Sequence, residues 1–152
     1  MKEMVLKPIG IVRSEVSEPR RAGWEQVTSE IIVDESLTES LDGLEAFSHI
    51  IVVYWMHKVL YAGLPRGKIH PQGREDLPLV GIFATRTPYR PNPLGVTVVR
   101  LLKRKGNVLR VVGLDAIDGT PIIDIKPYIP PFDSPPHVEV PDWVEKLNRR
   151  QP

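Results

Sequence analysis

The sequence contains no cysteine and no long hydrophobic run, and these two absences exclude several classes of protein. Without cysteine there is no disulfide framework, no thiolate metal site and no cysteine nucleophile. No apolar stretch approaches the roughly 20 residues of a membrane-spanning helix, and the N-terminal residues lack the apolar core of a signal peptide. We therefore expect a soluble, cytoplasmic protein without membrane contacts.

The chain also lacks an excess of either charge. Its 152 residues carry a formal net charge of +1, so contact with nucleic acid would require a local basic patch. No G-x-G-x-x-G follows a strand-like run, and the Walker A and G-x-S-x-G motifs are absent. Because His57 and His70 show no metal-ligand spacing with a third ligand, we predict no metal.

Proline, by contrast, is abundant, with 16 among 152 residues, which is about twice the average usage. Frequent proline disfavours long helices. Short runs of β-branched residues that end at turn residues predict about seven strands and one or two short helices. We therefore predict a mainly all-β fold: one small β-barrel domain covering residues 1–152, without an additional C-terminal domain.

The expected elements follow from these runs and turns. Strands are predicted at Val5–Arg13, Gln26–Val33, Ile50–Trp55, Val96–Lys103 and Val108–Leu114, with further strand-like runs at Leu79–Ala84 and around Asp118–Pro121. A hairpin turn is expected at Lys105–Asn107. Short helices are predicted within Asp34–Leu44, ending near Gly43, and at Pro141–Arg150, while Tyr61–Pro78 is expected to be irregular.

The stretch from Gly81 to Leu101, GIFATRTPYRPNPLGVTVVRL, looks least like ordinary core or ordinary loop. It carries Arg86, Arg90 and Asn92 among three prolines. A loop stiffened by proline loses less freedom on folding, so it can hold donors in place before a ligand arrives. Guanidinium groups suit phosphate and carboxylate, and stack on flat rings. This pattern favours a site that combines the loop with the turn Asp118–Pro121, although a surface turn with solvated arginines is the alternative.

Three other residues also have two interpretations. His57 follows the buried strand at a place where site residues collect, but a histidine beside a core strand is often only structural. Arg20 and Arg21 form either a second polar wall of the site or a solvated loop.

Two long motifs, ATRTPYRPNPLG and DAIDGTPIIDIKPYIP, resemble in this order the TsaA-like, or TrmO, family. Members of that family are S-adenosylmethionine-dependent tRNA methyltransferases. The resemblance implies a small β-barrel, S-adenosylmethionine as cofactor, tRNA as partner and a homodimer. It also implies methyl transfer to N6 of threonylcarbamoyladenosine at tRNA position 37. A barrel that binds S-adenosylmethionine or RNA without turnover, or a methyltransferase with another substrate, is the alternative.

Motif matching assigns the expected site residues. The resemblance implies cofactor binding by Pro19, Arg20, Arg21, His57, Lys58, Arg86, Val96, Asp118, Gly119, Thr120 and Pro121. We expect substrate contacts from Arg90, Asn92 and Tyr128. Asp118 and His57 are the candidate catalytic residues, as general bases for the transfer. Arg21 departs from the family pattern, which has glutamine there, and Lys58 departs from it too.

Overall fold

The computed structural model describes residues 1–59 and 67–148. The chain divides into two compact units. The first consists of Met1–His57 and Leu94–Tyr128, and the second of Lys58–Pro93 and Ile129–Pro152.

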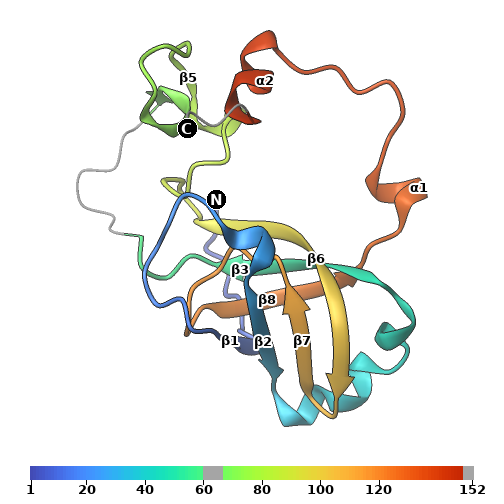
Figure 1. The fold of residues 1–152 in the computed structure, drawn as a ribbon. Coiled ribbons are helices and arrows are strands. Elements are labelled where there is room, and N and C mark those ends of the chain that lie inside the picture. Colours follow the sequence, from blue (N-terminus) through green and yellow to red (C-terminus); the bar gives the residue numbers. More distant parts are fainter. Residues whose placement is uncertain (60–66, 149–152) are drawn as a thin grey trace. The chain divides into compact units, whose positions relative to one another are not determined.

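The first unit contains a closed β-barrel (Figure 1). Its strands are β1 (Gly10–Arg13), β2 (Thr28–Val33), β3 (His49–Trp55), β6 (Leu94–Lys105), β7 (Val108–Val112) and β8 (Pro121–Pro127). They pair antiparallel in the order β1-β2-β7-β6-β3-β8, and β8 returns to β1 to close the barrel. The prediction of a mainly β fold built on a small barrel is confirmed.

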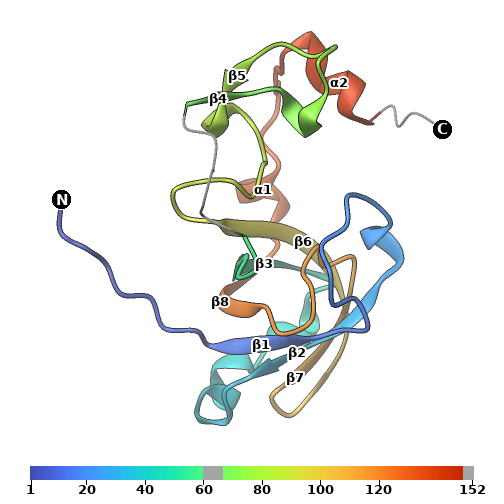
Figure 2. The ribbon, with the colours of Figure 1, turned by 90° about the vertical axis from the view of Figure 1, so that its left-hand side faces the viewer.

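Alternating side chains explain why these strands close around a core. In β3, Ile50, Val52 and Tyr54 are buried while the residues between them face outward. This is the period of two that a strand with one buried face requires. Ile31 and Leu109 fill the same core from the neighbouring strands β2 and β7, which stand side by side in the turned view (Figure 2). Because β3 pairs with both β6 and β8, its predicted place inside the sheet is confirmed.

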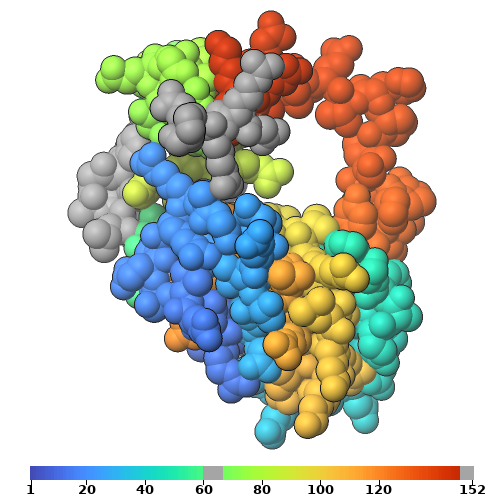
Figure 3. Space-filling model, viewed as in Figure 1, coloured from blue at the N-terminus to red at the C-terminus, as the bar shows by residue number. Residues whose placement is uncertain are grey.

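The hairpin of β6 and β7 is also confirmed. Lys105 pairs with Val108, and Gly106 takes a positive φ of 60° in the turn between the strands. Asn107 fixes this turn to the barrel, since its Nδ2 donates to the Val33 carbonyl at 2.6 Å. In the space-filling view, this hairpin and the N-terminal segments form one continuous face of the unit (Figure 3).

Two predicted strands are wrong in length. Only Gly10–Arg13 of the run Val5–Arg13 is a strand, because Pro8 has no N–H to donate to a ladder. Of Leu79–Ala84, only Val80–Gly81 is a strand, β5, and it pairs with β4 (Lys68–Ile69) of the second unit rather than with the barrel. The chain then enters a 3₁₀ turn, η5 (Ile82–Ala84).

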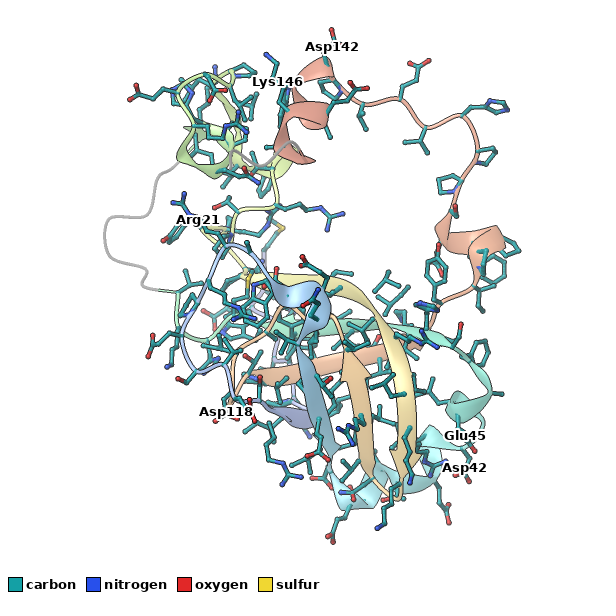
Figure 4. The ribbon with its side chains drawn as sticks, in the orientation of Figure 1. Arg21, Asp42, Glu45, Asp118, Asp142 and Lys146 are labelled. Carbon is teal, nitrogen blue, oxygen red and sulfur yellow. The ribbon has the colours of Figure 1, made fainter. Side chains whose placement is uncertain are left out.

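The helix predicted within Asp34–Leu44 is a 3₁₀ helix, η2 (Glu35–Leu41), followed by η3 (Leu44–Ala46). The Asp34 carboxylate caps η2 by accepting the Ser36 N–H at 2.9 Å. The Arg104 guanidinium holds this region, because its Nη1 lies 2.9 Å from Asp42 and 3.3 Å from Glu45. Figure 4 shows the two carboxylates together at one end of the barrel.

The second unit contains β4, η4 (Pro71–Gly73), β5, η5, α1 (Pro130–Asp133) and α2 (Asp142–Asn148). The terminal helix is thus confirmed as α2, and Arg74 contacts it by donating from Nη1 to the Lys146 carbonyl at 3.0 Å. Leu60–Arg66 of the predicted segments, and Arg149 and Arg150 of the predicted helix, lie outside the described residues. Within residues 1–59 and 67–148, none of the helices has the length and apolar character needed to cross a membrane.

Candidate functional site at one end of the barrel

Strand direction brings several expected site residues to one end of the barrel. Trp55, where β3 finishes, pairs with Leu94, where β6 begins. Tyr54 pairs with Ile122 near the start of β8, and Ile11 of β1 pairs with Pro121. The turn Asp118–Pro121 therefore lies at the barrel end to which β3 delivers His57.

Asp118 is held by the chain that continues from β1. Its Oδ1 accepts the Ser14 N–H at 2.9 Å, and its own N–H donates to the Val16 carbonyl at 2.7 Å. The residue is exposed, and one carboxylate oxygen serves this backbone contact. The Asp118 carboxylate is thereby fixed in direction, and among residues 1–59 and 67–148 no donor to its second oxygen, Oδ2, is found. Turn chemistry and a place in a site are compatible at this position.

Gly119 lies next to the His57 ring. It has a φ of +81°, and a Cβ built there would lie 3.7 Å from His57 Nε2. Its N–H donates to the Val12 carbonyl at 2.8 Å, so the turn is bound to β1 on both sides of the glycine. Bare backbone beside an imidazole is an arrangement that allows a ligand to approach closely. The structure thus brings His57 next to the turn Asp118–Gly119, which is far from it in the sequence. The sequence connected the two segments only through the family motifs.

Thr120 lies within the same turn, and its predicted contact with the cofactor stays a prediction. It is 2% exposed, and its Oγ1 donates to the Ile117 carbonyl at 2.7 Å. Its carbonyl accepts the Val12 N–H at 2.9 Å. Thr120 therefore shapes the turn, with its hydroxyl directed to the protein rather than outward.

The loop Pro19–Gly23 is organised around Trp24. Arg20 lies over the Trp24 ring at 4.9 Å, and its Nη2 donates to the Gly23 carbonyl at 3.0 Å. Trp24 returns a hydrogen bond from Nε1 to the Arg20 carbonyl at 2.9 Å. The Arg20 guanidinium therefore makes these contacts within its own loop. Figure 4 shows Arg21 well separated from Asp118, so the structure does not bring these two expected cofactor residues together.

Val96 faces outward from β6. It is 50% exposed and pairs with Val53 of β3, beside the pair Val98 and Ile51. These four side chains form an apolar strip on the outside of the barrel, because a strand places alternate residues on the same face. Val96 is therefore a surface residue of this strip, and its predicted role stays a prediction.

The loop Thr85–Asn92 and Lys58 belong to the second unit. Arg86 and Asn92 are exposed. Arg90 is half-buried, and its Nη1 donates to the carbonyls of Thr85 at 2.9 Å and Thr87 at 3.2 Å. The sequence predicted one site from this loop and the turn Asp118–Pro121. The two segments lie in different units, so the combined site stays a prediction.

Tyr128 lies at the other end of the barrel from Asp118. It follows β8, where its N–H donates to the His49 carbonyl at 3.1 Å and its ring meets the His49 ring edge-on at 6.5 Å. Seven residues of β8 separate the two ends, which is about 20 Å of strand. The predicted substrate contact of Tyr128 stays a prediction.

A cavity of about 490 Å³ also lies at this opposite end, beneath η2 and η3. Its walls include Leu37, Leu41, Phe47, Asp124 and Ile125, and none of the predicted site residues. Within the described ranges, 1–59 and 67–148, no group of three or more acidic or histidine side chains is placed to hold a metal ion.

The exposure of one residue, Phe83, was not predicted from the sequence. Phe83 stands within an apolar run and looks like core, yet it is 76% exposed. Apolar sequence alone cannot distinguish a strand residue from an exposed residue of a 3₁₀ turn.

The fold and this end of the barrel define a class of protein: a small closed barrel that presents a fixed carboxylate and bare glycine backbone from one turn, and a histidine from a second segment. Residues 12–134 match the family of the tRNA-methyltransferase O N-terminal domain. The chain therefore belongs to that family.

Individual proteins give the same result. A probable S-adenosyl-L-methionine-binding protein of Pyrococcus abyssi is 41% identical over 145 residues, which cover 92% of this chain and 76% of that protein. The tRNA (adenine(37)-N6)-methyltransferase of Mus musculus is 42% identical over 108 residues, covering 71% of this chain but 25% of that protein. A crystal structure of TrmO from Pseudomonas aeruginosa matches with a TM-score of 0.73 and 31% identity, covering 93% of this chain and 62% of the crystallised chain.

Proposed function

We propose that the chain is an S-adenosylmethionine-dependent methyltransferase that acts on N6 of threonylcarbamoyladenosine at tRNA position 37. The observation that carries the proposal is the meeting of His57 with the turn Asp118–Gly119 in a barrel of this family. The relatives named as tRNA (adenine(37)-N6)-methyltransferases support the reaction class. The threonylcarbamoyl group and a cytoplasmic location are finer parts of the proposal, and come from the family resemblance.

The residues at this barrel end fit S-adenosylmethionine. One oxygen of Asp118 is fixed by the Ser14 N–H, which leaves the other to accept a hydrogen bond from an amino or hydroxyl group. Gly119 leaves its backbone open beside His57. The cofactor supplies a methyl group on a positively charged sulfur, and a neighbouring carboxylate favours positive charge.

The chain's own residues then position the reactants and move a proton. Bound S-adenosylmethionine would give up its methyl group to the adenosine nitrogen, and that nitrogen would lose a proton. His57 Nε2, in its neutral form, is the candidate acceptor of that proton, and Asp118 is the second candidate. Because the methyl group passes in line between two atoms, positioning by the rigid turn contributes much of the rate.

A homodimer is the quaternary state we propose. The outward strip of Ile51, Val53, Val96 and Val98 supports it, since contiguous exposed apolar surface marks interaction sites. Sedimentation velocity at micromolar concentration tests this part. A strictly monomeric species would overturn the dimer without affecting the reaction.

One observation favours a second candidate, a barrel that binds the cofactor and acts on another substrate. The chain covers 76% of the P. abyssi protein, which is named for S-adenosyl-L-methionine binding, but only 25% of the mouse methyltransferase. The mammalian protein therefore has much sequence that this chain does not match, and tRNA selection could reside there.

Two measurements test the proposal. Calorimetric titration with S-adenosylmethionine is expected to show binding by the wild type that Asp118→Ala abolishes. The matched control is Asp34→Ala, which removes another carboxylate that accepts a backbone N–H, from Ser36, outside the expected site. Incubation with tRNA that contains threonylcarbamoyladenosine, followed by mass spectrometry of its nucleosides, should show a gain of one methyl group on that nucleoside. Binding without transfer to tRNA would favour the second candidate.

A further inference from the structure

We propose that Phe83 is a stacking platform for an unpaired base of the RNA substrate, held in place by Arg90. This inference rests on the proposed function, because it concerns the same RNA. It assigns a role to a side chain that the family motifs leave without one.

The first argument is exposure. Phe83 is 76% exposed, in the 3₁₀ turn between Val80–Gly81 and the proline-rich loop. Its neighbour Ile82 is 9% exposed, so the turn is anchored by one apolar side chain and presents the next to solvent. An aromatic ring on a well-anchored turn offers its face at little cost in conformational freedom.

The second argument is the guanidinium behind the ring. The Arg90 Cζ lies 5.9 Å from the centre of the Phe83 ring. The Arg90 Nη1 donates to the carbonyls of Thr85 and Thr87, so the position of the guanidinium is set by the backbone. A cation near one face of an aromatic ring attracts the ring and helps to fix it. Arg90 therefore acts here as a positioning residue for Phe83.

The third argument is the rigidity of the turn and loop. Thr85 donates from Oγ1 to the Ile82 carbonyl at 2.7 Å, and its N–H donates to the same carbonyl at 3.1 Å. The N–H groups of Thr87 and Tyr89 donate to the hydroxyls of Thr85 and Thr87, each at 3.3 Å. These contacts order the segment that carries Phe83 and Arg90 before any ligand binds.

The chemistry of the segment selects the ligand. Two exposed residues follow Phe83 closely in the sequence: Arg86, and Tyr89 with 45% of its surface exposed. Aromatic faces combined with arginine are the usual means by which proteins bind unpaired bases, whereas a paired helix hides its bases in the stack. An unpaired base of the tRNA loop that contains position 37, the position named for the relatives' reaction, is the occupant that we assign to the Phe83 ring.

The experiment measures the affinity of the full chain for two RNA probes of equal length. One is an anticodon stem–loop with unpaired loop bases, and the other is a fully paired hairpin stem. The variants are Phe83→Ala, Phe83→Trp and Phe83→Leu. The matched control is Phe132→Ala, because Phe132 of α1 is similarly exposed, at 80%, but lies outside the loop.

We expect Phe83→Ala to weaken stem–loop binding by roughly 5- to 100-fold, the range for loss of one stacked base. Phe83→Trp should bind like the wild type, and Phe83→Leu like Phe83→Ala, because leucine is apolar but has no flat face. Phe132→Ala and the paired probe should show no such loss. The slope of log affinity against log salt should be the same for Phe83→Ala and wild type, since stacking releases no phosphate counterions.

Four results would overturn the inference: unchanged stem–loop affinity in Phe83→Ala, rescue by leucine, a lowered affinity for S-adenosylmethionine without RNA, or a change of oligomeric state. The last two would assign the ring to the cofactor or to a subunit contact. Its failure is distinguishable from failure of the proposed function. If wild type methylates tRNA and Phe83→Ala is indistinguishable from it, only the stacking role falls. If wild type neither binds nor methylates RNA, both fall.

Discussion

The Tyr54 ring lies directly over Gly95, its cross-strand partner on β6. A Cβ at position 95 would overlap ring carbons of Tyr54 and come within 2.8 Å of the Tyr54 hydroxyl oxygen. That hydroxyl is 2.9 Å from Thr97 Oγ1 on the same strand, so the ring is held at both ends. The glycine is therefore required at this position for a packing reason, and an aromatic ring covers the gap that it leaves.

Gly95→Ala is expected to lower the free energy of unfolding by about 1–3 kcal/mol, the cost of forcing an extra methyl into a packed core. Urea denaturation measures it. Tyr54→Ala should be destabilising alone, but the double variant should cost less than the sum of the two changes, because the clash disappears with the ring. Strict additivity would show that Tyr54 is not the obstacle.

Gly119→Ala is expected to strain the backbone at residue 119 and also to weaken the binding of S-adenosylmethionine. A side chain at a φ of +81° costs roughly 1–2 kcal/mol. Gly113→Ala is the matched control, since Gly113 has a φ of +95° but nothing within 4 Å of its Cβ position. Denaturation should find similar losses in both variants, whereas calorimetry should find weakened S-adenosylmethionine binding only in Gly119→Ala. Equal cofactor affinity in the two variants would contradict our placement of the site.

Ser29→Ala is expected to stabilise the barrel by about 1 kcal/mol. Ser29 is 3% exposed, and its Oγ has no hydrogen-bond partner among the described residues. Removing a buried hydroxyl without a partner recovers its desolvation cost. Thr120→Val is the control with the opposite sign, because the buried Thr120 hydroxyl donates to Ile117. A loss of stability in Ser29→Ala, measured by thermal and urea denaturation, would refute the prediction.

Asp115→Asn is expected to stabilise the protein at neutral pH. Asp115 is exposed, but desolvation of its carboxyl by the surrounding protein raises its pKa above the ordinary value of 3.8. A raised pKa means that the folded state holds the proton more tightly, so the carboxylate's contribution to stability falls as pH rises above 3.8. The increase in melting temperature should therefore be present at pH 7 and absent below the ordinary pKa.

Asp34→Asn is expected to change the melting temperature at neutral pH in the opposite direction to Asp115→Asn. Hydrogen bonds from the Ser36 side chain and backbone lower the pKa of Asp34. Its stabilising effect is present above the ordinary value and is lost as pH falls through the lowered pKa. Asp34→Asn should therefore lower the melting temperature at pH 7, and the difference from wild type should shrink in acid. The same sign for both variants at pH 7 would show that desolvation of Asp115 is not the cause.

Local sequence was sufficient to predict those elements whose signals are local. The hairpin of β6 and β7 follows from two β-branched runs around Gly106–Asn107, and α2 follows from Pro141 and Asp142, which suit the start of a helix. The predictions failed at Val5–Ile9 and Ile82–Ala84, because apolar runs identify burial or a strand only where a partner is available to pair with them.

The site shows the same division. The sequence by itself determined the residue types: a glycine that tolerates positive φ, an aspartate at a turn, a stiff proline-rich loop with arginines and the motifs that identify the family. Only the tertiary structure decided which of these meet, because contacts depend on strand order and register. Closure of the barrel put Gly119 beside His57 and left Tyr128 a strand length away. It was likewise the folded turn, and not its apolar sequence, that left Phe83 exposed while burying Ile82.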